Sequence, residues 1–253
     1  MRITNKLHLP AGIMHACSNN KHNRPGRLSA TTLLKGVKEM LLTERHWDEI
    51  EVDVADQIWA IWGTAVHALL EHEGADDFTE EHIEMQVGNI TITGRIDNYN
   101  MRDGIITDYK TASVCKVKFA DFEDWRKQGL IYAWLLIKNG FTVNKCRFIA
   151  LLKDHSKTDA ERDASYPQSP VYVYEFNVTD ENIKYISYFC ENKIKDYLLY
   201  KDVTDDAIPE CVPDERWQKP EKYAVMKAGR KSAVKLFDDK ESAESLAVEV
   251  GGY

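Results

Sequence analysis

Two tight turns divide the middle of the chain into three strand-like runs, and this pattern limits the fold more than any other feature of the sequence. Gly88-Asn89 and Asp103-Gly104 are pairs typical of β-hairpin turns, because these residue types tolerate a positive φ angle. The runs around them are rich in Ile, Thr and Tyr, which favour strands. Residues 82–112 are therefore predicted to form three consecutive antiparallel strands.

Helical and strand patterns on both sides of this segment predict an α/β fold. Helices are expected over residues 29–47, 55–73, 119–139 and 180–200, the last capped by Asp180, and strands over 144–153 and 171–178. The apolar side of the second helix consists of Ile58, Trp59, Ile61, Trp62, Val66, Leu69 and Leu70. The order α-β-β-β-α-β predicts a mixed central sheet flanked by helices, with a small C-terminal appendage.

The chain divides into three predicted parts. Residues 1–27 are polar and are expected to be a mobile N-terminal segment, residues 28–208 form the main domain, and residues 209–253 form a small basic ββα-like appendage. Within the main domain, residues 154–170 are too hydrophilic to be core, and we expect a loop that acts as a lid or strand guide.

The composition excludes several classes of protein. With 43% hydrophobic residues and 29% charged residues in 253, the chain can bury a substantial core. No apolar run approaches the roughly 18 residues of a membrane span, and no signal peptide is recognisable. The five cysteines are scattered and form no CxxC pair, which argues against a disulfide framework and a zinc ribbon. We therefore expect a cytoplasmic protein of a bacterial cell, and a phage gene remains an alternative origin.

The net charge of −8 is unevenly distributed. Residues 43–84 contain thirteen acids and one base, whereas residues 115–153 contain eight bases and three acids, and residues 213–235 seven bases and three acids. A protein with opposed faces can hold a polyanion despite a negative total charge. Trp125, Trp134 and Trp217 are interleaved with the basic stretches, where one of them could stack on a frayed base. Tryptophans on an apolar helix are more often core residues, which is the alternative. Ordinary solvated faces are the alternative.

Asp97, Asp108 and Lys110 lie on two of the predicted strands. A two-residue loop at Asp103-Gly104 sets Asp97 opposite Lys110, and a loop one residue earlier sets it opposite Asp108; either register places all three on one face. Two close carboxylates repel each other unless a cation lies between them, and oxygen ligands favour Mg²⁺ or Mn²⁺. A cross-strand Asp–Lys salt bridge is the alternative.

Two helices add polar pairs at the spacing i, i+4. His67 and Glu71 share a face of the second predicted helix, and Gln128 and Tyr132 share a face of the third. A lone histidine on a helix is more often a surface or core residue than a metal ligand. The alternative for Gln128 and Tyr132 is that both are half-exposed at the edge of the core. If buried, the amide and the phenol need polar partners.

Taken in order, these residues resemble the PD-(D/E)XK nuclease superfamily, in its branch of RecB-like and lambda-type exonucleases. The resemblance covers roughly residues 28–152 and rests on His67 in G-T-x-V-H-x-x-L-x-E, Asp97 in G-R-I-D, Asp108-Tyr109-Lys110 as D-x-K, and Gln128-x-x-x-Tyr132. It implies a restriction-endonuclease-like core.

The resemblance also implies roles for these residues. Asp97, Asp108, the Tyr109 carbonyl and His67 would bind the metal, and Lys110 would act on the attacking water. Gln128 and Tyr132 would hold the site and touch the DNA backbone, while Glu71 or Glu84 would reach the metal through water. Some relatives carry an iron–sulfur cluster, but only Cys211 lies in the C-terminal region, so we expect none here.

The leading functional prediction is a Mg²⁺-dependent DNA exonuclease of recombination or repair, with Asp97, Asp108 and Lys110 as catalytic residues and Mn²⁺ able to replace Mg²⁺. A structure-specific endonuclease and a catalytically inactive DNA-binding module are the alternatives. DNA is the expected partner, together with a single-strand annealing or other recombination protein and a second copy of the chain. No membrane association is expected.

Overall fold

A computed structural model describes residues 1–17, 26–70, 77–218 and 221–252. They form two compact units, Met1–Glu210 and Cys211–Tyr253. The elements of the first unit are β1 (Arg2–Thr4), α1 (Ala11–Cys17), β2 (Arg27–Ser29), α2 (Ala30–Leu33), α3 (Val37–Arg45), η1 (Trp47–Glu49), β3 (Glu51–Asp53), η2 (Val54–Gln57), α4 (Ile58–Leu70), β4 (Asp77–Val87), β5 (Ile90–Asn100), β6 (Ile105–Ala112), α5 (Val114–Lys118), α6 (Glu123–Lys138), β7 (Lys145–Leu152), α7 (Lys157–Arg162), β8 (Val171–Asn177), α8 (Asp180–Tyr200) and η3 (Asp205–Ala207).

A mixed sheet forms the centre of the first unit. Its strands follow the order β2-β5-β6-β7-β8, and β4 also pairs with β5. The β4–β5, β5–β6 and β7–β8 pairs are antiparallel, whereas β2–β5 and β6–β7 are parallel. The chain order α4-β4-β5-β6-α6-β7 confirms the predicted α-β-β-β-α-β core and the α/β class.

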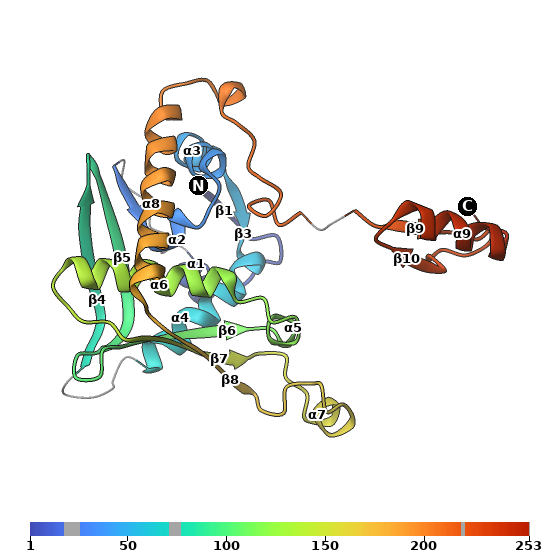
Figure 1. The fold of residues 1–253 in the computed structure, drawn as a ribbon, viewed down its shortest axis with the longest axis horizontal. Helices are drawn as coiled ribbons and strands as arrows, with labels where there is room; N and C mark the ends of the chain where they lie inside the picture. Colours follow the sequence, from blue (N-terminus) through green and yellow to red (C-terminus); the bar gives the residue numbers. More distant parts are fainter. Residues whose placement is uncertain (18–25, 71–76, 219–220, 253) are drawn as a thin grey trace. The chain divides into compact units, whose positions relative to one another are not determined.

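Helix α6 supplies much of the core, and two glycines let it approach the sheet. It contacts β4, β5, β6 and β7, and α8 crosses it (Figure 1). A Cβ atom added at Gly94 of β5 would lie 2.9 Å from Leu135 Cδ1, and one added at Gly129 would lie 3.1 Å from the Phe148 ring. Such distances are shorter than normal carbon–carbon contacts, so any larger residue would push α6 away from the sheet.

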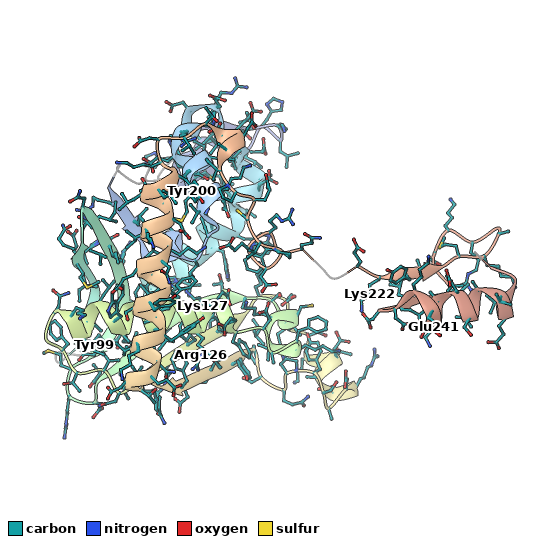
Figure 2. The ribbon with its side chains drawn as sticks, turned by 45° about the horizontal axis from the view of Figure 1, so that its top comes forward. Tyr99, Arg126, Lys127, Tyr200, Lys222 and Glu241 are labelled. Carbon is teal, nitrogen blue, oxygen red and sulfur yellow. The ribbon has the colours of Figure 1, made fainter. Side chains whose placement is uncertain are left out.

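The contact of α6 with α8 and β8 also uses its charged residues. Arg126 and Lys127 lie on α6 where α8 crosses it (Figure 2). The Arg126 guanidinium lies 4.9 Å from the Phe176 ring centre, and the Lys127 ammonium 5.4 Å from that of Phe189. Part of the basic stretch over residues 115–153 therefore contacts aromatic rings within the fold.

Several helix boundaries differ from the predictions. Ser29 caps a helix as its position suggested, because its side chain accepts a hydrogen bond from the Thr32 amide, but the helix breaks before Gly36, which caps α3. Helix α8 is capped by Thr179 rather than Asp180, through a reciprocal pair of hydrogen bonds with Asn182. The third predicted helix begins at Glu123, and α5 precedes it.

Two segments expected to lack regular structure contain some. In the N-terminal segment, β1 pairs in parallel with β3, and α1 follows. The loop over residues 154–170 contains α7, and the Tyr166 hydroxyl accepts a hydrogen bond from the Ser156 amide. Local hydrogen bonds of this kind are hard to foresee in polar sequence.

Helix α4 does not bury the apolar side that its sequence suggested. None of its residues is buried, and Trp59 and Trp62 keep 57% and 53% of their surface exposed. The side that does pack is defined by Gly63, whose Cα approaches β6 closely enough that an added Cβ would lie 3.5 Å from Thr111 Oγ1. Among the described residues, no helix is long and apolar enough to cross a membrane.

The second unit is a small ββα arrangement. Its elements are β9 (Tyr223–Val225), β10 (Lys235–Phe237) and α9 (Lys240–Val250). The two strands pair antiparallel, and Val225 and Ala243 are buried. Lys222 and Glu241, labelled in Figure 2, belong to a basic hairpin and an acidic helix. The bases of the hairpin include Lys227, Arg230, Lys231 and Lys235, and the acids of the helix are Glu241, Glu244 and Glu249.

Candidate active site

The site lies where β5 and β6 separate. The two strands pair only from Asn98↔Thr107 to Asn100↔Ile105, and this register, continued by one residue, sets Asp97 opposite Asp108. It is the second of the two registers that the sequence allowed. Beyond the last pair, the Tyr109 amide donates to Asp97 Oδ2 at 2.8 Å. The Asp97 carboxylate therefore lies alongside the backbone of β6.

Helix α4 brings His67 to the same carboxylate. His67 Nδ1 lies 3.1 Å from Asp97 Oδ1, and the hydrogen bond to Asp97 raises the pKa of His67, although burial opposes it. Gly63, one turn earlier on α4, lies beside Thr111 of β6, so His67 faces the sheet as well. Asp97 thus joins α4 to the backbone of β6 through its two oxygens.

Asp108 is the most buried acid of the group, with 2% of its surface exposed. Lys110 Nζ lies 2.7 Å from Asp108 Oδ2, yet this oxygen accepts no hydrogen bond of proper geometry. Burial raises the pKa of the Asp108 carboxyl, the Lys110 charge lowers it, and the Asp97 charge raises it further. A buried carboxylate beside a second carboxylate is a suitable place for a cation.

Helix α6 holds Lys110 through an amide. Gln128 Oε1 accepts a hydrogen bond from Lys110 Nζ at 2.9 Å, and Gln128 Nε2 donates to the Tyr132 hydroxyl at 2.9 Å and to Asp108 Oδ1 at 3.4 Å. Gln128 and Tyr132 are 7% and 5% exposed, so they are buried and not at the edge of the core. Burial also raises the pKa of Tyr132, which keeps its hydroxyl protonated.

Some neighbours of the site have no obvious signal in the sequence. Gly94 lies under Tyr132, because an added Cβ would come within 3.1 Å of that ring. Phe148, fully buried on β7, pairs with Asp108 in the β6–β7 ladder, and the Lys110 ammonium lies 5.8 Å from its ring centre. The glycine of G-R-I-D was a usable signal, since glycine inside a strand often marks a close approach. Phe148 looks like any core aromatic in sequence.

The structure thus brings together seven of the predicted site residues, which are His67, Asp97, Asp108, Tyr109, Lys110, Gln128 and Tyr132. Glu84 does not join them, because it is exposed on β4 and forms an ion pair with Arg27. Glu71 lies outside the described residues. Trp125 and Trp134 are buried in the core, so their predicted role as DNA-stacking residues is wrong, whereas Trp217 is 74% exposed.

The donor set is compatible with a divalent cation, although it is incomplete. Within the described residues, no three side chains of the types His, Cys, Asp and Glu form a ready metal-binding group. The carboxylates of Asp97 and Asp108 are the oxygen ligands that a hard cation prefers, and the register of β5 and β6 sets them opposite each other. Such cations also accept backbone carbonyls and water as ligands, so two carboxylates are a sufficient anchor.

Comparison with known proteins agrees with this geometry. The family model described as the PD-(D/E)XK nuclease superfamily matches residues 13–187. The crystal structure of SSO0001 superimposes with a TM-score of 0.53 at 16% identity, covering 76% of this chain and 86% of that one, which supports the fold.

Two further solved structures are more distant. A phage-related exonuclease from Haemophilus somnus 129PT has a TM-score of 0.44 at 13% identity, covering 70% of this chain and 96% of that one. An alkaline exonuclease from Laribacter hongkongensis has a TM-score of 0.46 at 11% identity, covering 71% and 91%. A search of curated proteins gave no match. Since the family model covers more than half of its length, the chain belongs to the PD-(D/E)XK nuclease superfamily.

Proposed function

We propose that this protein is a Mg²⁺-dependent deoxyribonuclease and that it acts as an exonuclease on DNA ends. The observation that carries the proposal is the buried group of Asp108, Lys110 and Gln128 beside the Asp97–His67 pair. A simple Asp–Lys salt bridge does not need a second carboxylate nearby, a buried amide that fixes the ammonium, or a histidine on the second carboxylate. A hydrolytic site uses all of them.

Asp97, Asp108, the Tyr109 carbonyl and His67 are the proposed metal-binding groups. When bound, Mg²⁺ or Mn²⁺ would supply a Lewis acid for the scissile phosphate and lower the pKa of an attacking water. The Tyr109 amide and His67 hold the two oxygens of Asp97 in fixed directions. This fixed orientation is the contribution of the protein, because a ligand that is already oriented loses little entropy when it binds.

Lys110 is the proposed charge-stabilising residue. Its ammonium is held between Asp108 Oδ2 and Gln128 Oε1, at 2.7 Å and 2.9 Å, which fixes a positive charge beside the proposed metal-binding carboxylates. A fixed positive charge at that position stabilises the negative charge that develops on phosphate oxygens as water attacks. Tyr132 holds Gln128 from behind, and both are proposed to support the site.

The exonuclease mode is supported by the surroundings of the site. The sequence over residues 43–84 is strongly acidic and would repel a DNA backbone, and the folded loop over residues 154–170 follows β7, the strand beside β6. Both features favour entry of a strand from a DNA end over binding of a duplex at an internal position. A role in recombination or repair, with a single-strand annealing protein as partner and a second copy of the chain in the assembly, is part of the proposal.

The test compares linear duplex with covalently closed circular duplex, each with and without Mg²⁺. We expect linear DNA to be degraded to short products only when Mg²⁺ is present, and closed circles to persist. Nicking of closed circles at the same enzyme concentration would favour the structure-specific endonuclease. An inactive binding module is disfavoured because Asp97, Asp108 and Lys110 are all present.

A further inference from the structure

The ring of Phe148 lies behind the group that holds Lys110. Phe148 is on β7 and is fully buried, and it pairs with Asp108 in the parallel β6–β7 ladder. Paired residues of neighbouring strands project to the same face of a sheet, so Phe148 and Asp108 both face α6. The Lys110 ammonium lies 5.8 Å from the centre of the Phe148 ring, within the roughly 6 Å of a cation–π contact.

Helix α6 lies against the same ring. A Cβ atom added at Gly129 would lie 3.1 Å from two carbons of the Phe148 ring, so the ring packs on the α6 backbone one residue after Gln128. Gln128 Oε1 in turn accepts the hydrogen bond from Lys110 Nζ at 2.9 Å. Phe148 therefore contacts both the helix that carries the amide and the ammonium that the amide holds.

Other aromatic rings fix the orientation of Phe148. Trp125 of α6 stacks with it, with ring centroids 5.8 Å apart and an interplanar angle of 15°. Tyr174 of β8 lies at 6.2 Å and 37°. A ring that is packed on several sides in a dense core has little freedom to move. Phe148 is thus a rigid contact for the Lys110 ammonium.

The chemistry of the ring suits the inner side of this ammonium. Asp108 Oδ2 at 2.7 Å and Gln128 Oε1 at 2.9 Å are polar partners of Lys110, whose side chain is only 21% exposed. An aliphatic side chain at position 148 would offer the ammonium no electrostatic stabilisation, whereas the negative face of an aromatic ring attracts a cation. The attraction is stronger where water is excluded, as it is beside a fully buried ring.

We propose, on the basis of the proposed nuclease function, that Phe148 is a positioning residue for Lys110. Its ring attracts the ammonium and keeps it between Asp108 and Gln128 while DNA is cleaved. Because Phe148 is fully buried, it cannot contact DNA and acts only through Lys110. It should therefore affect the rate of cleavage and leave the affinity for DNA unchanged. The alternative is a core aromatic that only fills space.

The first test replaces Phe148 with 3-fluorophenylalanine or 3,5-difluorophenylalanine in the full chain and measures cleavage of linear duplex DNA in Mg²⁺. Fluorine withdraws electron density from the ring face and weakens its attraction for a cation, while the size of the ring hardly changes. The maximal rate should fall with one fluorine and further with two, and the whole contact is worth roughly 2- to 30-fold. The melting temperature and the KM for DNA should stay parental.

The same analogues at Phe122 are the matched control. Phe122 belongs to the same aromatic cluster, where its ring centre lies 5.3 Å from that of Trp125 and 4.6 Å from that of Tyr174. Its fluorination therefore changes a ring of this cluster without changing the one beside Lys110. The maximal rate should stay parental.

The second test removes each ring altogether. Phe148→Leu and Phe122→Leu should both lower the melting temperature, because each replaces a buried ring with a smaller side chain. Only Phe148→Leu should also lower kcat, by roughly 2- to 30-fold at parental KM, when both variants are assayed well below their melting temperatures.

The outcomes separate this inference from the proposed function. If the parent cleaves DNA, parental rates in both fluorinated Phe148 proteins, or equal losses of kcat in the two leucine variants, would show that Phe148 only fills space and would leave the nuclease function intact. If the parent shows no Mg²⁺-dependent cleavage, the proposed function fails and this inference fails with it.

Discussion

Replacing Gly94 with alanine should destabilise the protein and loosen the candidate site at the same time. The new Cβ would lie 2.9 Å from Leu135 Cδ1 and 3.1–3.2 Å from two ring carbons of Tyr132. Overpacking of this kind costs about 1–3 kcal/mol. For a chain of this size, about 2 kcal/mol lowers the melting temperature by roughly 4–8 °C.

The assay is urea unfolding and thermal melting of Gly94→Ala, with Gly12→Ala as the matched control. Gly12 lies in α1, and a Cβ added there meets nothing within 4 Å, so alanine should be neutral or slightly stabilising. Adding Leu135→Val to Gly94→Ala should recover part of the loss, because it removes the nearest clash. Parental stability in Gly94→Ala, or no recovery in the double variant, would refute the argument that Gly94 is needed for the packing of α6.

Three other perturbations test separate parts of the molecule. His46 forms hydrogen bonds with Asp205 and Glu49 that raise its pKa. The stability that protonated His46 supplies is therefore fully present below about pH 6.5 and is lost as the pH rises through the raised pKa. His46→Gln should remove this pH dependence of the melting temperature, and an unchanged dependence would contradict the role of His46. Truncation at Pro213 removes the basic hairpin and should weaken binding to duplex DNA. The magnitude of the slope of log K against log salt should fall by about 0.9 for each phosphate that the hairpin binds. Unchanged binding would indicate that this unit is a structural or docking element. Gln128→Ala should reduce the cleavage rate more than it weakens DNA binding, since it frees the Lys110 ammonium. Gln128→Glu should not restore the rate, because it keeps an acceptor for Lys110 but turns a carboxylate oxygen toward Asp108 Oδ1. Equal losses in rate and affinity would contradict a positioning role.

Local chemistry explains why the order of elements was predictable. The Gly88-Asn89 and Asp103-Gly104 pairs lie at the observed turns, where both glycines have positive φ angles of 58° and 65°. Between them, the alternation of side chains on β5 and β6 brings Asp97 and Asp108 together whichever register forms. The i, i+4 spacing of Gln128 and Tyr132 likewise predicts that the two side chains lie on the same face of any helix. These signals depend on a few neighbouring residues and therefore appear in the sequence.

Features that depend on distant partners were not predictable. The pattern of α4 shows that it is apolar, but it cannot show that Trp59 and Trp62 keep more than half of their surface exposed. The reverse holds for Trp125 and Trp134, whose basic neighbours suggested exposure, whereas α6 buries both. The family resemblance implied that Glu84 could reach the metal through water, but Glu84 is exposed and forms an ion pair with Arg27 on β2. Each of these outcomes depends on which element packs against which.

The most direct test of the central proposal is the cleavage of linear duplex DNA in Mg²⁺ by Asp108→Asn, compared with the parent. The substitution keeps the volume and removes one buried carboxylate charge, and the Lys110 ammonium, which is 21% exposed, keeps Gln128 Oε1 as a partner, so the fold should persist in circular dichroism. The proposal predicts that the purified variant is folded, still binds DNA, and has no detectable Mg²⁺-dependent cleavage. Cleavage at the parental rate by folded Asp108→Asn would show that the group at the separation of β5 and β6 is not the active site.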